Sequence, residues 1–469
     1  MTFSSPIFLF CFFPIVFLLY ALIPNRFLRL RNALLIVASL LFYGWGEPFA
    51  MLLMLGVVFL SYCTALGIGH GGIIRKIAYP LGIIGDLSVL CIYKYADFFI
   101  GSFNAVSGLH LPLPHLSLPI GISFFIFQAV SYLIDTARKE VPPQRNFFKL
   151  LLYISFFPQL VAGPIVRYQT IAEALESRQF SLADITSGLR RMILGLSKKL
   201  LLADTLGQIA DTAFSMGNSL SLPIAWLGAI CYTLQIYYDF SGYSDMAIGM
   251  GRMFGFAFDE NFDYPYISCS ITEFWKRWHI SLTTWFRSYL YIPLGGNRKG
   301  NARTILNKWV VFFCTGLWHG ASWNFILWGL LNGALMTLEQ IICKGKKPRR
   351  RGFFMHLYTM LAVCLAFVLF RADNLTQAVC FYRTMFYDPS LSMASLTHCT
   401  QLLSPLVIVT LLLAILFATP ILRIGIRAVA QKSKDAAVVC TSLGALVLLL
   451  LCMMNVAASS YHPFIYFRF

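Results

Sequence analysis

The sequence predicts an all-α membrane protein that crosses the bilayer many times. Of its 469 residues, 58% are hydrophobic and only 12% are charged, whereas a soluble protein carries about 25% charged residues. Apolar runs long enough to cross a bilayer, which takes roughly 20 residues, recur along the chain. These runs are continuous and do not alternate strictly between apolar and polar residues, so they favour helices over a closed barrel.

The candidate spans cover most of the chain and predict about ten to thirteen crossings, some of them re-entrant. Because no long hydrophilic stretch interrupts the series, we expect one membrane domain over residues 1–469, whose chemistry is done in or beside the bilayer. The first run lacks a basic segment and a cleavage site, so it is expected to be a retained span. The candidates are 6–23, 32–45, 49–68, 77–93, 118–135, 147–163, 185–203, 222–240, 305–340 (long enough for two crossings), 353–371, 401–419 and 436–457.

The basic residues, which bring the net charge to +17, gather in short clusters between apolar runs, Lys198–Lys199 among them. Cytoplasmic loops of membrane proteins collect Lys and Arg, so these clusters indicate topology and not nucleic-acid binding. With Arg26–Arg31 and Lys344–Arg351 in the cytoplasm, the N-terminus and residues 372–400 lie outside, and Arg423–Lys434 returns inside. The 12 cysteines form no C-x-x-C pair, so neither a disulfide framework nor a metal site is expected.

The uncharged run Trp309–Leu338 holds a histidine at a depth where an ionisable group is costly. As one helix its 30 residues would be about 45 Å long, against a bilayer core of about 30 Å, so the run must tilt, break or re-enter. Small residues at 315–316 and 320–322 mark the expected break, and His319 lies between them in G-L-W-H-G-A-S-W-N. The run alone leaves open whether His319 is structural or functional.

A neutral imidazole at this depth could act as a general base. Transfer of an acyl group from a thioester to an alcohol requires that the alcohol lose its proton during attack. An imidazole can take that proton and pass it to the leaving thiolate. Burial lowers the pKa of a histidine in general, which keeps the ring neutral and ready as a base. No covalent nucleophile is needed if donor and acceptor meet at one point.

Residues 270–290 predict an amphipathic helix at the membrane surface. Ser270 and Glu273 form a capping-box pattern, which marks a helix start. Aromatic residues then follow one face of the helix, and basic and hydroxyl residues follow the other. His279 lies at the edge of the apolar face, so it could point into the protein.

Two interpretations of this amphipathic segment stay open. In the first, it is only an anchor at the membrane surface. In the second, it is a cytoplasmic lid over a pocket for an anionic, phosphate-bearing donor. The phosphates would then meet Lys276, Arg277, Arg298 and Lys299.

Two further segments place polar or helix-breaking residues in apolar surroundings. Residues 237–245, Y-Y-D-F-S-G-Y-S-D, end a span with two carboxylates, which lie either at the water boundary or in the wall of a reaction chamber. Residues 157–168 hold two prolines and a glycine, which indicate a broken or re-entrant segment. Such backbone is tolerated at membrane depth only against protein or a cavity.

Six stretches carry motifs of a known family. They are F-P-Q-L-V-A-G-P-I at 157–165, Y-Y-D-F-S-G-Y-S-D-M-A-I-G at 237–249, N-F-D-Y-P-Y-I-S at 261–268, I-T-E-F-W-K-R-W-H-I-S-L-T-T-W at 271–285, Y-L-Y-I-P-L-G-G-N-R at 289–298 and G-L-W-H-G-A at 316–321. Together they resemble the membrane-bound O-acyltransferase family, in its bacterial alginate O-acetyltransferase branch. The resemblance runs from the N-terminal F-S-S-P-I-F-L-F to the terminal F-I-Y-F-R-F, with core motifs at about 118–340 and C-terminal spans at 353–457.

The resemblance implies a helical core with re-entrant and interfacial helices around a central tunnel. It implies that His319 and His279 are the catalytic histidines, and it leaves open which of them moves the proton. Donor-binding or tunnel-lining roles are expected among nearby polar and aromatic residues. These are Asp239, Ser241, Tyr243, Asp245, Glu273, Trp275, Lys276, Arg277, Trp278, Trp318 and Asn324.

The implied function is that of an O-acetyltransferase in the inner, cytoplasmic membrane of a cell. The donor is expected to be cytoplasmic acetyl-CoA, which is a substrate, with no permanently bound cofactor. The acetyl group would pass through the membrane near the histidines to an extracytoplasmic polysaccharide. Because the chain contains no esterase-like domain, the resemblance implies a separate exported partner with a Ser-His-Asp site.

The resemblance leaves the acceptor polymer open. Relatives acetylate alginate, cellulose or peptidoglycan, and a related branch transfers D-alanine to teichoic acid. Two alternatives belong to a different class of protein. One is a transporter that makes and breaks no bond, which inverted repeats would favour, although none is visible in the sequence. The other is a non-catalytic scaffold of a polysaccharide export complex.

Overall fold

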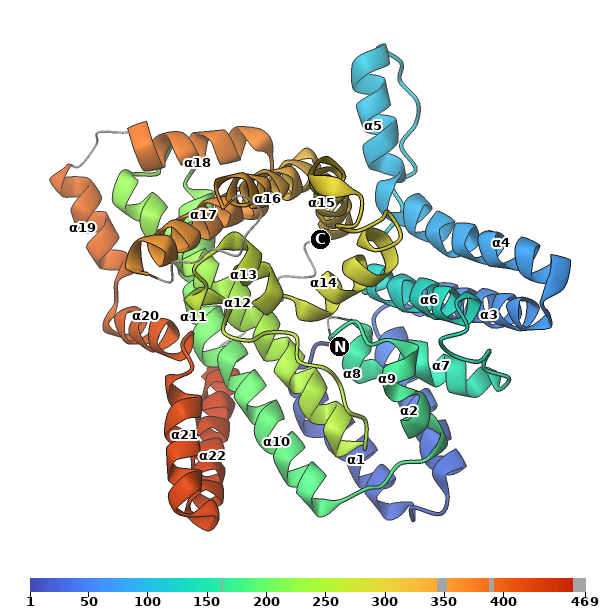
Figure 1. Cartoon of the computed structure of the whole chain (residues 1–469). Helices are drawn as coiled ribbons and strands as arrows, with labels where there is room; N and C mark the ends of the chain where they lie inside the picture. The colour runs from blue at the N-terminus through green and yellow to red at the C-terminus, as the bar shows by residue number, and fades with distance from the viewer. Residues whose placement is uncertain (162, 344–351, 388–391, 459–469) are drawn as a thin grey trace. The chain divides into compact units, whose positions relative to one another are not determined.

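The computed structural model describes residues 1–161, 163–343, 352–387 and 392–458. Every regular element in these ranges is a helix, which confirms the all-α prediction (Figure 1). The chain divides into two compact units, which are described separately. Unit 1 comprises Met1–Met192 with Ser244–Glu260, and unit 2 comprises Ile193–Tyr243 with Asn261–Phe469. A single membrane domain over the whole chain stays a prediction, as does the topology.

Unit 1 is built around α6 (Ile122–Ala137), of which nearly every residue is buried. The long helices α3 (Pro48–His70) and α4 (Gly72–Leu90) pack against each other and against α6. They approach closely at Gly82, where an added Cβ would lie 2.3 Å from the Thr64 side chain. The other helices are α1 (Phe13–Leu22), α2 (Leu28–Gly44), α5 (Ala96–Ser107), α7 (Phe147–Ser155), α8 (Phe157–Leu160), α9 (Tyr168–Glu176) and the start of α10 (Leu182–Ser197).

The segment 157–168 is broken, as its prolines and glycine predict. Helix α8 covers only Phe157–Leu160, and the next helix begins at Tyr168. The broken backbone packs against protein, because Gln159 is fully buried and its Nε2 donates a hydrogen bond to the carbonyl oxygen of Tyr153. A Cβ added to Gly163 would lie 2.5 Å from the Gln159 Cα, so only glycine fits there. Ala162 of this motif lies outside the described residues.

Unit 2 holds the remaining helices around an aromatic and aliphatic core. Helix α12 (Leu222–Met253) belongs to unit 2 as far as Tyr243, and its last turns belong to unit 1. The other helices are α11 (Asp204–Ser215), α13 (Ile271–Arg277), α14 (Ile280–Phe286), α15 (Gly300–His319), α16 (Trp323–Ile342), α17 (Phe353–Arg371), α18 (Leu375–Tyr387), α19 (Met393–Leu402), α20 (Pro405–Phe417), α21 (Ile421–Lys432) and α22 (Lys434–Ala458).

Among the described residues, four helices are long and apolar enough to cross a membrane: α3, α16, α17 and α22. The pair α19 and α20, bent by 75°, would make a fifth. The predicted ten to thirteen crossings are therefore too many by this measure, because several apolar runs are divided into shorter helices. The run 147–163, for example, is split into α7 and α8. The basic cluster Lys344–Arg351 and the terminal F-I-Y-F-R-F lie outside the described residues.

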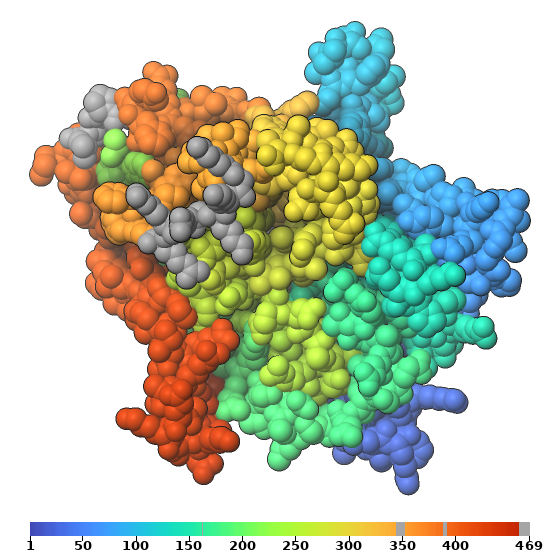
Figure 2. Space-filling model, in the orientation of Figure 1, coloured from blue at the N-terminus to red at the C-terminus, as the bar shows by residue number. Residues whose placement is uncertain are grey.

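Apolar side chains cover much of the outer surface, as a lipid environment requires. Helix α22 is the clearest case, because only 11% of its apolar stretch is buried. It forms a hairpin with α21 that extends from the rest of unit 2 (Figure 2). Exposed leucines on α22 include Leu443, Leu446 and Leu450.

The uncharged run around His319 breaks at Gly320–Ser322, one of the two predicted places. Helix α15 ends at His319 and α16 begins at Trp323, while residues 315–316 stay helical. The two helices touch through glycines, as small-x-x-x-small patterns do in membranes. A Cβ added to Gly316 would lie 2.3 Å from the backbone oxygen of Phe325. A Cβ added to Gly329 would lie 2.2 Å from the backbone oxygen of Phe312.

We expect Gly329→Ala to destabilise the α15–α16 hairpin by about 1–3 kcal/mol, because the new methyl group meets a backbone oxygen that cannot rotate away. Thermal unfolding of the detergent-purified protein measures this effect. Gly333→Ala is the matched control. Its Cβ would lie in ordinary van der Waals contact with the Phe312 Cβ at 3.5 Å and with Trp309 at 3.8 Å, and alanine favours the helix over glycine by about 1 kcal/mol. Equal thermal unfolding midpoints for the two variants would contradict the close contact of Gly329 with the Phe312 backbone oxygen.

Candidate functional site

The predicted helix over 270–290 is wrong as a single element, because the chain turns sharply at His279. Its start is confirmed, since Ser270 Oγ accepts a hydrogen bond of 3.0 Å from the Glu273 amide. Helix α13 then ends at Arg277, and His279 adopts a left-handed backbone conformation with φ +44°. The two halves of the apolar face therefore point into unit 2 from different directions.

The segment 261–263 satisfies the backbone groups that the break exposes. The Ile280 amide donates to the Asn261 carbonyl oxygen at 2.9 Å, and the Asp263 amide donates to the Arg277 carbonyl oxygen at 3.0 Å. A continuous helix would have paired these groups internally, as the sequence pattern predicts. Hydrogen bonds to a distant segment explain why the helix is divided at this point.

The break holds the His279 side chain completely buried. Its Nδ1 lies 3.2 Å from the Asn261 Oδ1, and its ring meets the Phe240 ring edge-on at 4.6 Å between centroids. Its Nε2 has no hydrogen-bond partner among the described residues. Burial lowers the pKa of His279 to about 3, so the imidazole is neutral at physiological pH.

His319 ends α15 inside an aromatic cage and is 4% exposed. Its ring lies edge-on to Trp318 at 4.9 Å, to Trp328 at 5.1 Å and to Phe370 at 5.1 Å between centroids. Trp318 also contacts His279 at 5.8 Å. The two predicted histidines therefore lie in one unit and share a tryptophan neighbour.

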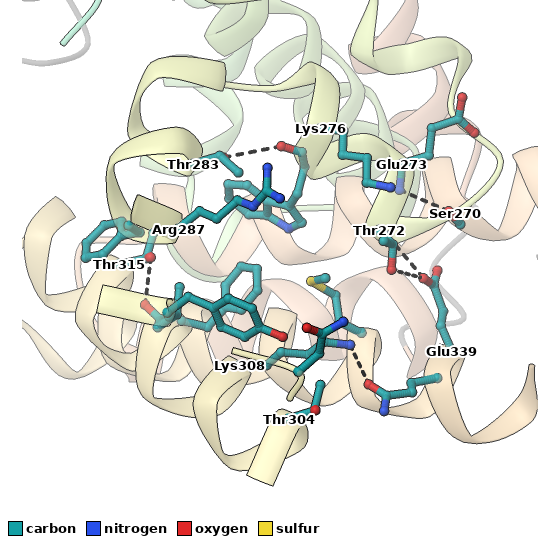
Figure 3. Close-up of a pocket in the computed structure, with 18 of the residues that line it drawn as sticks. Ser270, Thr272, Glu273, Lys276, Thr283, Arg287, Thr304, Lys308, Thr315 and Glu339 are labelled. Atoms are coloured by element: carbon teal, nitrogen blue, oxygen red, sulfur yellow. Dashed lines mark hydrogen bonds between the residues drawn. The ribbon is translucent and has the colours of Figure 1, made fainter. Parts of the chain in front are cut away.

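Beside the histidines, α13, α14, α15 and α16 enclose a cavity of about 1120 Å³ (Figure 3). Figure 3 shows Lys276 and Arg287 on one side of the cavity and Lys308 with Thr304 on the opposite side. The lining also contains hydroxyl and amide groups. These are contributed by Ser270, Thr272, Thr283, Thr284, Tyr291, Asn297, Asn301, Thr315 and Gln340.

The two carboxylates in this wall are occupied by neighbouring donors. Glu339 caps the N-terminus of α13, because it accepts hydrogen bonds from the Ile271 amide at 2.5 Å and the Thr272 amide at 3.1 Å. Glu273 pairs with Arg277 at 3.1 Å. Lys276 and Arg287, in contrast, form no ion pair within the described part of the chain. Lys308 forms no ion pair in this part of the chain either, since its Nζ donates to the neutral Gln340 Oε1 at 2.5 Å, so the cavity offers three cations to an anionic ligand.

An aromatic layer separates the cavity from His319. Trp275 lines the cavity and contacts Phe312 at 5.2 Å and Trp328 at 5.7 Å between ring centroids. Trp275 is held in place, since its Nε1 donates to the Asn332 Oδ1 at 3.1 Å. Neither histidine lines the cavity itself, and Trp328 is the ring that joins the cavity wall to His319.

Three other predicted residues lie away from the cavity. Arg277 pairs with Asp263 at 3.1 Å as well as with Glu273, so its charge is compensated. Trp278 stacks on Phe274 at 5.4 Å between ring centroids in the core of unit 2. The Asn324 Nδ2 donates to the Ala372 carbonyl oxygen at 2.6 Å, which fastens α16 to the end of α17.

The polar stretch at 237–245 is buried and does not lie at a water boundary. Asp239 and Asp204 both pair with the buried Lys199, each at 2.7 Å. Ser241 and Tyr243 are also buried in unit 2.

Asp245 belongs to unit 1, where it pairs with Arg191 at 2.7 Å.

Sequence reasoning missed four residues of this region: Lys199, Asn261, Arg287 and Lys308. The sequence predicts Lys199 only as part of a basic cluster. Its partners Asp204 and Asp239 form no local sequence pattern that would indicate a buried ion pair. Asn261 lies inside a recognised motif and Arg287 lies in the predicted amphipathic segment, so their positions could have signalled a role. Lys308 has no such signal, because only the fold brings it to the cavity.

Comparison with known proteins identifies one family. The model of the membrane-bound O-acyltransferase family matches residues 118–417. The chain is 41% identical to the protein of Pseudomonas putida named probable alginate O-acetylase AlgI, with 100% of each chain covered. It is 38% identical to the protein of that name from Azotobacter vinelandii, again over 100% of each chain. It is 36% identical to the peptidoglycan O-acetyltransferase of Helicobacter pylori, over 80% of this chain and 78% of that protein.

We expect Lys199→Met to lower the free energy of unfolding by about 3–5 kcal/mol, because it leaves Asp204 and Asp239 buried without their cation. Denaturation of the purified protein in detergent measures the loss. Arg423→Met is the control, since Arg423 and its partner Asp263 are about half exposed and such a pair contributes about 0–1 kcal/mol. A Lys199 variant as stable as the control would contradict a structural role for the ion pairs of Lys199 with Asp204 and Asp239.

Proposed function

Because the chain belongs to the membrane-bound O-acyltransferase family, it is a membrane acyltransferase, and we propose that it transfers acetyl groups from cytoplasmic acetyl-CoA to an extracytoplasmic polysaccharide. Family membership confirms the predicted enzyme class and removes the basis for a transporter or a scaffold. The observation that carries the proposal is the pair of buried histidines beside a cavity lined by three cations that form no ion pair among the described residues.

The cavity matches the chemistry of coenzyme A as a donor. The phosphates of the coenzyme are anions, and Lys276 and Arg287 are cations without a protein partner in the described residues. Hydroxyl and amide groups around them can bond further phosphate oxygens. The thioester end would extend toward Trp275, which is the part of the wall that leads to His319.

The transfer needs no covalent intermediate on the protein. One histidine takes the proton of the acceptor hydroxyl while the hydroxyl oxygen forms its bond to the acetyl carbon. The bond between that carbon and the sulfur breaks, and its electron pair stays on the sulfur. The imidazolium then gives the proton to the thiolate, which restores the neutral base and releases the free thiol.

The acceptor follows from the relatives that match over their full length. Two of them carry the name of an alginate O-acetylase, which favours a polymer of alginate type as the acceptor. Peptidoglycan is the second candidate, because of the relative from Helicobacter pylori. We further propose an inner-membrane location and an exported esterase-like partner with a Ser-His-Asp site that receives the acetyl group.

D-alanyl transfer to teichoic acid has weaker support. The chain is 28% identical to the teichoic acid D-alanyltransferase of Bacillus subtilis, and the match covers only 55% of this chain. Reconstituted protein supplied with labelled acetyl-CoA would distinguish the two reactions. Acetyl-dependent release of free thiol supports acetyl transfer, and release only with a D-alanyl donor contradicts it.

We expect His319→Ala to reduce acetylation of the polymer by at least about 100-fold, because it removes one of the two histidines of a site whose acid–base catalysis contributes at least that factor. Cells that carry the variant are assayed for ester-bound acetate, and the purified protein is checked for normal yield and unfolding temperature. His356→Ala is the control, because His356 lies on α17 outside the cage and bonds the Ser268 carbonyl oxygen. Wild-type acetylation by a well-folded His319 variant would exclude this residue from the proposed site.

We expect Lys276→Met and Arg287→Met each to raise the KM for acetyl-CoA about tenfold, because each removes a charge-assisted contact to phosphate, and to leave kcat nearly unchanged. Initial rates of thiol release measure both constants. Lys432→Met on the exposed helix α21 serves as a control for net charge. An unchanged KM in both cavity variants would place the donor elsewhere.

A further inference from the structure

The His279 ring is held by one buried amide side chain. The Asn261 Oδ1 lies 3.2 Å from the His279 Nδ1, and Asn261 is 1% exposed. The backbone of the same residue closes the helix break, since its carbonyl oxygen accepts the Ile280 amide at 2.9 Å. Asn261 therefore contacts both the main chain beside His279 and its imidazole.

The orientation of the Asn261 amide is set by a backbone donor. The Ser281 amide lies 3.1 Å from Oδ1, and a backbone N–H can only donate. The Ser281 hydroxyl lies 2.9 Å from the same oxygen. If the amide were flipped, its NH₂ group would face the Ser281 N–H, and two donors would oppose each other. The atom that faces His279 is therefore the carbonyl oxygen.

An acceptor opposite Nδ1 determines which ring nitrogen carries the hydrogen. The neutral imidazole has one N–H and one lone pair, and only an N–H at Nδ1 can bond a carbonyl oxygen. The lone pair then lies on Nε2, which is buried and has no partner among the described residues. In the opposite tautomer, the lone pair of Nδ1 would face a lone pair of the Asn261 carbonyl oxygen. The N–H would then lie at Nε2, where it would be buried without an acceptor among the described residues.

We propose that Asn261 is a positioning residue that holds His279 as its Nδ1–H tautomer, so that Nε2 is the proton acceptor in acyl transfer. This assignment rests on the proposed function for the reaction, although the tautomer itself does not. The groups that face His279 are Phe240 from α12, Trp318 from α15, Ser281 from α14 and Asn261. Since none of them is charged, the tautomer depends on hydrogen bonding and burial.

Nitrogen NMR of ¹⁵N-histidine-labelled protein in lipid bilayers tests the tautomer without any substrate. The chain has eight histidines, and loss of a signal in His279→Gln assigns the ring. We expect a protonated Nδ1 and an unprotonated Nε2 in the wild type, and a mixture of tautomers in Asn261→Ala. A protonated Nε2 in the wild type overturns the proposal.

Kinetics of the same variants test the consequence for the reaction. We expect Asn261→Ala to lower kcat at least about tenfold and to change the KM for acetyl-CoA less than about twofold, since the residue acts through the base and not through the donor. Ser281→Ala is the matched control, because it keeps the backbone N–H that orients Asn261. It should retain the Nδ1–H signal.

Asn261→Asp keeps an acceptor of the same shape, so it tests the proposal even if the alanine variant does not fold. A carboxylate beside Nδ1 favours the protonated ring and raises its pKa. The acid side of the pH profile of kcat should therefore move to higher pH by about one unit or more, with the Nδ1–H signal retained. An unmoved profile overturns the proposal.

The outcomes separate this proposal from the proposed function. If His279→Gln keeps wild-type kcat, acetyl transfer stands and the role of His279 as the proton acceptor is overturned. If the wild type releases no thiol from acetyl-CoA and the NMR signals are as expected, the proposed function fails and the tautomer is correct. That second result overturns the role of Nε2 as the proton acceptor and leaves the Nδ1–H tautomer in place.

Discussion

A short set of hydrogen bonds at the break between α13 and α14 determines the geometry of unit 2. The Asn261 and Arg277 carbonyl oxygens accept the amides of Ile280 and Asp263, and the chain can therefore turn at His279 without burying unpaired backbone groups. A continuous helix would carry His279 along a surface stripe. The turn instead places it inside the unit, against Phe240 and Trp318.

The second histidine depends on close packing of two helices. Glycines at 316 and 329 let α15 and α16 approach until a methyl group would overlap a backbone oxygen. This contact positions the end of α15, where His319 meets the rings of Trp328 and Phe370. The packed rings surround the imidazole, which is 4% exposed.

Charge is distributed differently in the cavity and in the core. Most buried charges in unit 2 are paired, as with Lys199 between Asp204 and Asp239, because an unpaired charge away from water is costly. Lys276 and Arg287 are exposed, and both line the cavity without an ion pair among the described residues. A cation that no protein group compensates next to a cavity is a reasonable site for an anionic substrate, and the acyltransferase family supplies a reaction that uses one.

The sequence by itself determined the membrane class, the helical fold and the family, since composition and contiguous motifs carry these features, and it proposed the two histidines that the structure places beside one tryptophan. It also located the break at 320–322 and the broken segment at 157–168, because glycine and proline act locally. Only the tertiary structure decided that 270–290 is two helices, that Arg277 is paired while Arg287 is not, and that Asn261 faces His279. Those facts depend on contacts between residues far apart in the chain, which no local pattern records.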